Sequence, residues 1–308
     1  MFRNRGPFEP GVGATLRSAA LATSYLPFRV ANQLGAAPEG SLRVLLYHDV
    51  GPREAEEFQS QLRWLAREWR FVSADQFAEL AFEGAPIKKK SVLLTFDDGF
   101  QSNLRAARDV LTPMKIPALF FVVNDFLGLD DVEAERAFIA DRIWPGLGRS
   151  RVPAHWRSMT WADTAELLER GHTIGAHTQT HARLGTIADH AMLQREIVDS
   201  GDRLSARLGC PISHFAFPFG DAASVSAAAL GIAASRYEWV HSGVRGNNAA
   251  RKLARLVVRD AVGLQEPAWA AGAFLEGACD RLHRAGAAEV ERRWVEGLSQ
   301  SGTDGGRA

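Results

Sequence analysis

Short apolar runs alternate with stretches of helical periodicity along this 308-residue chain, and this alternation constrains its fold more than any other feature. Residues 43–47, 91–96 and 117–122 are largely apolar, as strands buried on both faces are. After the first run, apolar side chains recur from Phe58 to Trp69 at the spacing of one helix face. Such alternation predicts an α/β architecture with a parallel sheet, either a barrel or an open sheet.

The alternation is interrupted between residues 124 and 157, which we interpret as an insertion with one short helix around 133–143. The insertion follows a strand, so we expect it to lie over the end of the sheet and to shape a groove there. The elements expected after it are a helix over 162–170, a strand over 173–176, a helix over 191–208, strands near Phe215, Ala233 and Leu256, an Ala-rich helix over 222–230, and two amphipathic helices, one with Phe274, Leu275, Ala278 and Leu282 and one with Val290, Trp294 and Leu298.

The chain is expected to have three parts: an arm at residues 1–40, a central α/β domain at 41–265, and C-terminal helices with a tail at 266–308. Within the arm, basic residues precede an apolar stretch at 18–28, but that stretch is too short and too polar for an export signal. No run of 18 apolar residues occurs, so no transmembrane span is expected. These features predict a cytoplasmic protein, with attachment of the arm to a membrane surface as the alternative.

The charge of the chain is balanced, with 36 Lys and Arg against 36 Asp and Glu. Nucleic-acid binding relies on a field of positive charge, so we do not expect nucleic acid as a partner. The two cysteines, Cys210 and Cys279, are too few for a disulfide framework and are not spaced as a metal-binding pair. Charge and cysteine content therefore exclude nucleic-acid-binding and disulfide-stapled proteins as classes.

Polar side chains follow two of the expected strands directly. Asp97 and Asp98 come after the strand at 91–96, and His177 and His181 come after the strand at 173–176. In a parallel sheet, the loops that follow the strands meet at one edge, where ligands bind. Two histidines and one carboxylate can hold a metal ion and leave coordination positions open for water and substrate. The alternatives are an Asp-Gly turn and a structural histidine pair.

A third segment with unusual backbone requirements follows the strand near Phe215. It reads Phe-Pro-Phe-Gly over residues 217–220. Pro218 fixes the chain, and Gly220 permits backbone angles that other residues avoid, so a rigid turn here would aim a backbone N–H at the same edge. Taken alone, the segment indicates only a turn.

These segments occur in the order typical of one enzyme family. The segments LTFDDGF at 94–100, HTQTH at 177–181 and FAFPFG at 215–220 resemble the polysaccharide deacetylase family, which shares the NodB homology domain and is carbohydrate esterase family 4. The similarity extends over residues 43–260, and the resemblance implies a distorted parallel (β/α) barrel. Supporting matches lie at 45–49, 159–161, 170–172 and 253–257.

The resemblance also implies a metal site and a reaction. Asp98, His177 and His181 would bind a divalent metal ion, expected to be zinc, and Asp97 would be the general base that takes a proton from the attacking water. The implied reaction removes N-acetyl groups from amino sugars in a glycan or in a sugar-linked glycan precursor. Hydrolysis of another non-peptide amide, such as a formyl-sugar or a ureide, and a non-catalytic carbohydrate-binding relative are the alternatives.

In the family, the backbone N–H that follows the proline of the third segment stabilises the oxyanion, and this role falls here on Phe219. A phenylalanine replaces the usual tyrosine, which leaves a backbone role intact. Phe217, Pro218, Gly220 and Trp239 are expected to contact the substrate. The candidates to stack on sugar rings are Phe100, Trp161, Phe217, Phe219 and Trp239, and we expect at least half of them to pack in the core instead.

Two residues typical of the family are absent. Many members carry an arginine in the third segment that pairs with the base, and we expect Arg255 to supply that charge to Asp97. Many members also carry a late histidine as general acid, but none stands in 253–258. We expect His48 to act as the acid, since it follows a predicted strand. The alternatives for that proton donor are His172, His241 and Asp97.

Overall fold

The computed structural model describes residues 40–82, 85–249 and 255–304, and the structural statements below concern these residues. The predicted arm at 1–40 lies outside them except for Gly40. The predicted boundary between the central domain and the C-terminal helices, near residue 265, stays a prediction.

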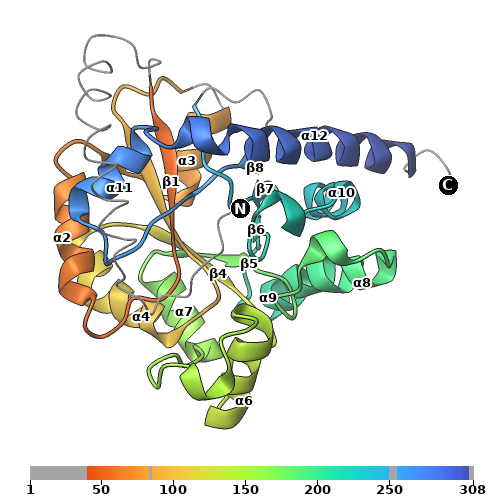
Figure 1. The fold of residues 1–308 in the computed structure, drawn as a ribbon, viewed down its shortest axis with the longest axis horizontal. Coiled ribbons are helices and arrows are strands. Elements are labelled where there is room, and N and C mark those ends of the chain that lie inside the picture. Colours follow the sequence, from red (N-terminus) through yellow and green to blue (C-terminus); the bar gives the residue numbers. More distant parts are fainter. Residues whose placement is uncertain (1–39, 83–84, 250–254, 305–308) are drawn as a thin grey trace.

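The strands of the described chain form one parallel sheet (Figure 1), which confirms the predicted α/β class. Their order in the sheet is β8-β7-β6-β5-β4-β3-β1-β9, and β2 pairs with β3. The strands are β1 (Leu42–Tyr47), β2 (Arg70–Phe71), β3 (Ser91–Phe96), β4 (Ala118–Val122), β5 (Thr173–Ala176), β6 (His214–Ala216), β7 (Trp239–His241), β8 (Leu256–Val257) and β9 (Asp260–Ala261).

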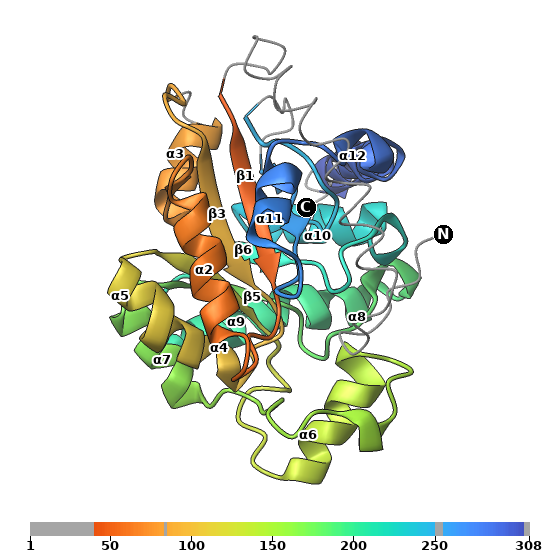
Figure 2. The ribbon, with the colours of Figure 1, turned by 60° about the vertical axis from the view of Figure 1, so that its left-hand side comes forward.

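The two ends of this sheet are almost continuous in the chain. β8 pairs with β7 at one end and β9 pairs with β1 at the other, and only Val258 and Arg259 separate β8 from β9. The sheet therefore curls until the segment that contains β8 and β9 connects β7 with β1, which gives a distorted barrel (Figure 2). Because all strands are parallel, the loops that follow them gather at one rim.

Helices cover the outside of the curled sheet, with α2 packed against α11 and α10 against α12. None of the described helices is long and apolar enough to cross a lipid bilayer. The helices are α2 (Ala55–Leu65), α3 (Ala74–Phe82), α4 (Gln101–Ala106), α5 (Thr112–Met114), α6 (Val132–Phe138), α7 (Trp161–Glu169), α8 (His190–Gln194), α9 (Ser200–Leu208), α10 (Ala227–Arg236), α11 (Ala268–Leu275) and α12 (Asp280–Asp304).

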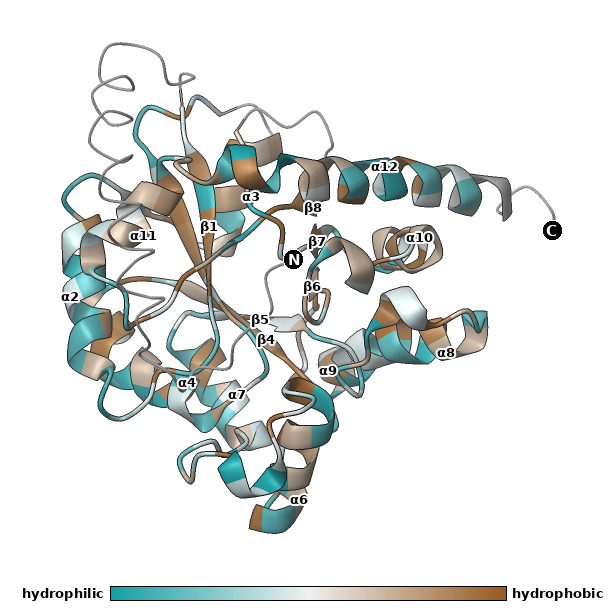
Figure 3. Cartoon of the chain, viewed as in Figure 1, coloured by the Kyte–Doolittle hydropathy of each residue, from teal (hydrophilic) through white to brown (hydrophobic). Residues whose placement is uncertain are grey.

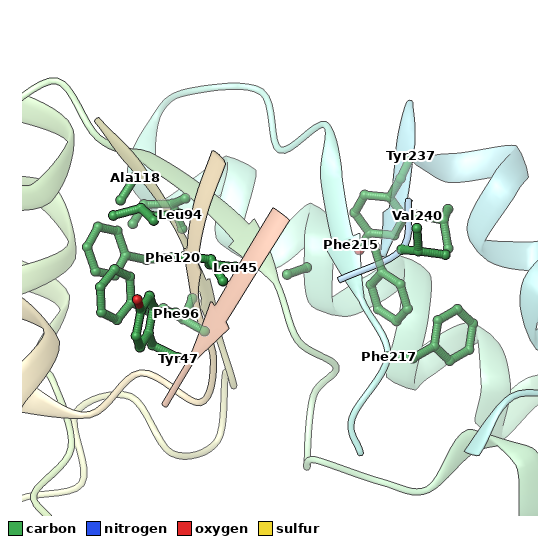
Figure 4. Packing of buried hydrophobic residues seen from close by; sticks show 14 of the residues in the cluster. Leu45, Tyr47, Leu94, Phe96, Ala118, Phe120, Phe215, Phe217, Tyr237 and Val240 are labelled. Atoms are coloured by element: carbon green, nitrogen blue, oxygen red, sulfur yellow. The ribbon is translucent and has the colours of Figure 1, made fainter. Parts of the chain in front are cut away.

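Alternate strand residues face two separate apolar clusters. Tyr47, Phe96 and Phe120 face the surrounding helices, and their rings stack with centroids 5.5 and 4.8 Å apart (Figure 4). The intervening residues, such as Leu93 and Phe121, belong to a second cluster on the other face of the sheet. In Figure 3 the strands are mostly hydrophobic, whereas the helices around them carry many hydrophilic residues.

Two predicted elements are wrong. The chain at Ala233 lies in α10, and the strand expected there is β7, some six residues later. Alanine favours helices, and the Ser226 hydroxyl accepts a hydrogen bond from the Ala229 N–H, which begins α10. The first predicted C-terminal helix is divided between α11 and α12 because Gly277, with φ of +88°, lies in the turn between them.

Candidate metal centre and active site

The loops that follow β3 and β5 bring the three predicted metal ligands together. The His181 Nε2 atom lies 3.2 Å from Asp98 Oδ1, and the His177 Nε2 atom lies 3.6 Å from the same oxygen. All three side chains are buried, with no more than 4% of any of them exposed. Across the part of the chain that the structure describes, no other group of three potential ligand side chains is close enough to share an ion.

The hydrogen bonds of the two histidines determine which ring nitrogen faces this cluster. His177 Nδ1 lies 2.8 Å from the Ala216 carbonyl oxygen, and His181 Nδ1 lies 2.9 Å from the Arg142 carbonyl oxygen. A carbonyl oxygen only accepts, so both Nδ1 atoms carry the proton and donate it. In the neutral rings, each Nε2 therefore presents a lone pair toward the Asp98 carboxylate. Electron pairs aimed at one point in this way repel one another unless a cation lies between them.

The Asp98 carboxylate is buried, and neither of its oxygens has a hydrogen-bond partner among the described residues. Burial raises the pKa of Asp98, but interaction with His181, and with the charges of His48 and His177, brings it down to about 2. Burial also lowers the pKa of His177 to about 4. At neutral pH the cluster holds an ionised carboxylate and a neutral imidazole, the states in which these groups bind metals. The donor set therefore fits a divalent cation.

The loops of the site adopt backbone conformations that side chains seldom tolerate. Four of the six described non-glycine residues with positive φ lie in them: Asp98 at 77°, Thr178 at 69°, His181 at 59° and Phe219 at 62°. Each such residue costs on the order of 1 kcal/mol or more, and the surrounding structure must compensate for it. Their concentration at one rim indicates that side-chain placement there overrides backbone preference.

Asp97, the predicted base, is held by a bidentate ion pair with Arg259. The two guanidinium nitrogens lie 2.7 and 3.0 Å from the two carboxylate oxygens. Arg259 is 1% exposed and also donates a hydrogen bond to the Ser242 carbonyl, so its own position is fixed. Asp97 Oδ2 lies 3.8 Å from His177 Nε2. The carboxylate of Asp97 thus stands beside the three ligands with a fixed orientation.

The predicted pairing of Arg255 with Asp97 is wrong. Arg255 precedes β8, and its Nε donates a hydrogen bond to the carbonyl of Glu238, which precedes β7. It therefore lies at the amino end of the sheet, opposite the site. Sequence reasoning missed Arg259, although this residue directly follows the apolar run ending at Val258, just as Asp97 follows its own strand. The same strand-end criterion, applied to this last run, would have identified it.

The turn after β6 carries the predicted oxyanion donor, Phe219. Gly220 has φ of +64°, and a Cβ added there would lie 2.4 Å from the Gly243 nitrogen, so only glycine fits. The Phe219 ring packs edge-on against the ring of His181, with centroids 4.8 Å apart. Among the described residues, no backbone carbonyl accepts a hydrogen bond from the Phe219 N–H. The residue that carries this unpaired N–H thus packs, through its ring, against a metal-ligand candidate.

Three aromatic side chains predicted to contact the substrate have other partners. The Phe217 ring packs against Phe215, with centroids 5.1 Å apart, in the outer apolar cluster (Figure 4). Trp239 begins β7, at the amino end of the sheet, and stacks on Phe82 of α3 at 4.1 Å. Trp161 begins α7 and lies beneath the Arg207 guanidinium. The predictions for Phe217 and Trp239 are wrong because one faces the helices and the other lies at the far end of its strand.

The candidate general acids lie at different ends of the barrel. His48 directly follows β1, at the rim, and its charge contributes to the lowered pKa of Asp98. His172 precedes β5, at the opposite end of that strand from His177. His241 is the last residue of β7, but it is fully buried and its ring is hydrogen-bonded to the ring of His214. The position of His48 leaves it as the predicted acid.

The segment predicted as an insertion at 124–157 lies at the rim, where α6 stands apart from the other helices (Figures 1 and 2). Arg142, at the end of this helical segment, supplies the carbonyl that orients His181. Trp144 follows, with its ring centroid 6.1 Å from that of His48. Sequence reasoning missed the Arg142 contact because a backbone acceptor has no residue signature.

Phe100, another predicted sugar contact, instead packs against Phe126 in the apolar cluster beneath the insertion.

Comparison with known protein sequences gives a consistent set of relatives. Residues 84–235 match the family described as polysaccharide deacetylase. The chain is 24% identical over 236 residues to the poly-beta-1,6-N-acetyl-D-glucosamine N-deacetylase of Escherichia coli strain K12, which covers 66% of this chain and 35% of that protein. The chain spans half or less of the length of the curated relatives that it matches.

Solved structures of similar fold come from several bacteria. IcaB from Ammonifex degensii matches with a TM-score of 0.61 at 23% identity, over 78% of this chain and 98% of IcaB. The Streptococcus pyogenes deacetylase PplD, solved in complex with acetate, matches with a TM-score of 0.60 at 19% identity, over 77% of this chain and 99% of PplD. At these identities the similarity concerns the fold, and it confirms the predicted distorted parallel barrel.

Proposed function

This chain belongs to the polysaccharide deacetylase family, and we propose that it is a metal-dependent hydrolase that removes N-acetyl groups from the amino sugars of a polysaccharide. The observation that carries this proposal is the unbalanced donor set at the rim. Asp98 is buried without a hydrogen bond, and two imidazole lone pairs face it. Beside it stands Asp97, a second carboxylate whose orientation is fixed by Arg259.

In this proposal the metal is held by Asp98, His177 and His181. When bound, such an ion lowers the pKa of water and polarises the amide carbonyl. The set of two imidazoles and one carboxylate is typical of catalytic zinc, so zinc is the metal that we propose. The carbonyls of Ala216 and Arg142 keep the imidazole protons on Nδ1, which leaves both Nε2 atoms for the ion.

The remaining roles belong to residues that surround the three ligands. Asp97 accepts a proton from the attacking water, and Arg259 keeps its carboxylate aimed at that water. The Phe219 N–H donates to the carbonyl oxygen of the acetamide as negative charge develops on it. His48 delivers a proton to the departing amine at the rim. Arg259 acts here only by positioning Asp97.

The proposed substrate is an N-acetylhexosamine polymer. One relative named above is a poly-beta-1,6-N-acetyl-D-glucosamine N-deacetylase, which makes oligomers of β-1,6-linked N-acetylglucosamine the first probe. The predicted cytoplasmic location stays a prediction. Fractionation of cells that express the tagged chain, followed by immunoblotting, would test it, and recovery outside the cytoplasm would contradict it.

The proposal is tested by acetate release from such oligomers with the metal-loaded protein, beside β-1,4-linked oligomers and formyl-sugar and ureide compounds. We expect acetate release that is lost on chelation and restored by zinc. Asp98→Ala should lose the stoichiometric metal, and Asp202→Ala, which changes an exposed aspartate on α9, should keep it. Metal analysis of the purified proteins provides this readout independently of any substrate.

Asp97→Asn separates the base from the ligands. The variant should retain metal and lose turnover by roughly 10²–10⁴-fold, the usual contribution of a general base. A metal-free wild-type protein would contradict the metal site, and an active Asp97→Asn enzyme would contradict the base. Turnover of a formyl or ureide compound with all acetylated sugars inert would replace the proposed reaction with hydrolysis of another amide.

A further inference from the structure

A side chain that the proposed reaction does not use lies directly against the Phe219 turn. The carbon at the centre of the Arg183 guanidinium lies 4.1 Å from the Phe219 ring centroid. His181 packs edge-on against the same ring, at 4.8 Å between centroids. The Phe219 ring is therefore held between a guanidinium and a candidate metal ligand, and both neighbours come from the loop that follows β5.

Arg183 also joins this loop to the segment beyond the turn. One of its nitrogens lies 3.1 Å from Asp221 Oδ1 and 2.5 Å from Ser224 Oγ. Close by, a Cβ added to Gly185 would lie 2.2 Å from the Ala223 carbonyl oxygen, so the two segments approach as closely as backbones can. On one side of the Phe219 turn, Gly220 packs closely against Gly243 and accepts a hydrogen bond from its N–H. On the other side, the turn contacts the loop that carries Arg183.

The conformation that this contact maintains is one that Phe219 does not favour by itself. Its φ of +62° costs a non-glycine residue on the order of 1 kcal/mol or more. A guanidinium over an aromatic ring contributes about 0.5–1 kcal/mol at a partly exposed site, which is comparable. The exposed ion pair with Asp221 contributes little. The hydrogen bond to Ser224 fixes the guanidinium in place, and the cation over the ring is the contact through which Arg183 acts on Phe219 itself.

We propose that Arg183 is a positioning residue that holds the Phe219 ring against His181 and thereby aims the Phe219 N–H at the reacting carbonyl. This inference rests on the proposed function for its catalytic consequence. From the sequence, Phe219 was assigned a role only through its backbone. In this proposal its ring also matters, because replacing the ring would change the direction of the Phe219 N–H. The proposal concerns the donor only, and metal binding should not depend on Arg183.

The test compares Arg183→Met with Arg236→Met. Arg236 is a matched control because it also pairs with an aspartate, Asp202, and lies over a tyrosine ring, that of Tyr237, away from the site. In Arg183→Met we expect kcat to fall about 10–100-fold, the range for a donor that is displaced rather than removed. KM and the zinc affinity should stay within about threefold. Arg183→Lys should recover part of kcat, and Arg236→Met should match the wild type.

A second readout does not require turnover. The order parameter of the Phe219 amide, measured by NMR relaxation, should be lower in Arg183→Met and unchanged in Arg236→Met. Phe219→Ala should lower kcat by a similar factor, and the double variant should lose little more than either single one. A kcat within twofold of wild type in Arg183→Met, an unchanged Phe219 amide, or a zinc affinity that falls in proportion to kcat would each overturn the proposal. If the wild type deacetylates nothing, the order parameter of the Phe219 amide still decides whether Arg183 holds the Phe219 turn.

Discussion

Two buried clusters of charge in this protein use similar residue types and balance their charges differently. At the rim, Asp98 faces the Nε2 atoms of His177 and His181 and has no hydrogen bond on either oxygen. On the outer side of β1, Asp260 lies 3.0 Å from the Nε atom of Arg43 and is fully buried. One carboxylate faces lone pairs, and the other faces a permanent cation.

The second cluster is also connected to more of the fold. Arg43 pairs with Asp280 at 2.9 Å and donates to the Phe274 carbonyl, so it joins β1 and β9 to both C-terminal helices. Burial raises the pKa of Asp260 to about 6 against the opposing charges of Arg43 and Arg245. A buried carboxylate with its cations in place indicates a structural role, and one without them indicates a ligand.

The largest expected effect comes from Asp98→Asn, which breaks the rim cluster. The variant should lose metal and deacetylase turnover by more than about 10³-fold, since the ion supplies most of the chemistry. Without metal it should unfold at a urea concentration no lower than that of the wild type, because the lost charge had no hydrogen bond and faced two lone pairs. Metal analysis, acetate release and urea titration provide the three measurements. Strong destabilisation of metal-free Asp98→Asn would contradict the comparison.

Asp260→Asn should lower the stability of the protein and leave metal binding and turnover nearly unchanged. It leaves Arg43 buried with only part of its countercharge, and removal of one partner from a buried pair typically costs about 3–5 kcal/mol in the free energy of unfolding. Metal content and turnover per folded molecule should stay within a few-fold of wild type. Urea unfolding monitored by circular dichroism measures the loss. A variant of wild-type stability would show that Asp280 alone suffices.

The comparison becomes sharper within one segment of the chain, where Arg255 and Arg259 stand four residues apart. Arg259→Met leaves Asp97 buried without its cation, and we expect turnover to fall about 10²-fold with metal retained. Arg255→Met removes only hydrogen bonds to carbonyls at the amino end of β7, and its turnover should match the wild type. Equal losses in the two variants would contradict the assignment of Arg259.

The smallest effect is the dependence of stability on pH in the metal-free protein. Burial lowers the pKa of His177 and His172 to about 4 and that of His214 to about 3. Unfolded histidines titrate near 6.5, so between pH 6.5 and 4 the unfolded state binds more protons than the folded state. The free energy of unfolding therefore decreases as the pH is lowered through this range. The raised pKa of Asp260 acts in the opposite direction below pH 6. Three histidines outweigh one carboxyl.

We therefore expect a net loss of about 1 kcal/mol between pH 6.5 and 6, measured by urea unfolding with chelator present. Asp260→Asn removes the opposing carboxyl, so its loss over the same interval should be steeper. Stability that rises as the pH falls through this range would contradict the sign.

The apolar runs predicted most strands because the central ones, β1, β3 and β4, are buried along their whole length and are therefore largely apolar. The motifs at 97–98 and 177–181 were likewise local, since a parallel sheet brings the ends of its strands to one rim. The strand expected near Ala233 failed because short apolar, Ala-rich segments fit a buried helix as well as a strand. Phe217 and Trp239 failed because residue type alone says nothing about which face or which end of a strand a side chain occupies.

By itself, the sequence determined the α/β class and identified the three candidate ligands with the carboxylate of Asp97 beside them. Both depend on short-range patterns: burial that makes a run apolar, and spacing that places polar groups at strand ends. Only the tertiary structure decided that Arg259 rather than Arg255 meets Asp97, that Arg142 orients His181 through its carbonyl, and that Arg183 covers Phe219. These contacts join segments far apart in the chain or depend on the direction of a side chain, and no local pattern encodes either.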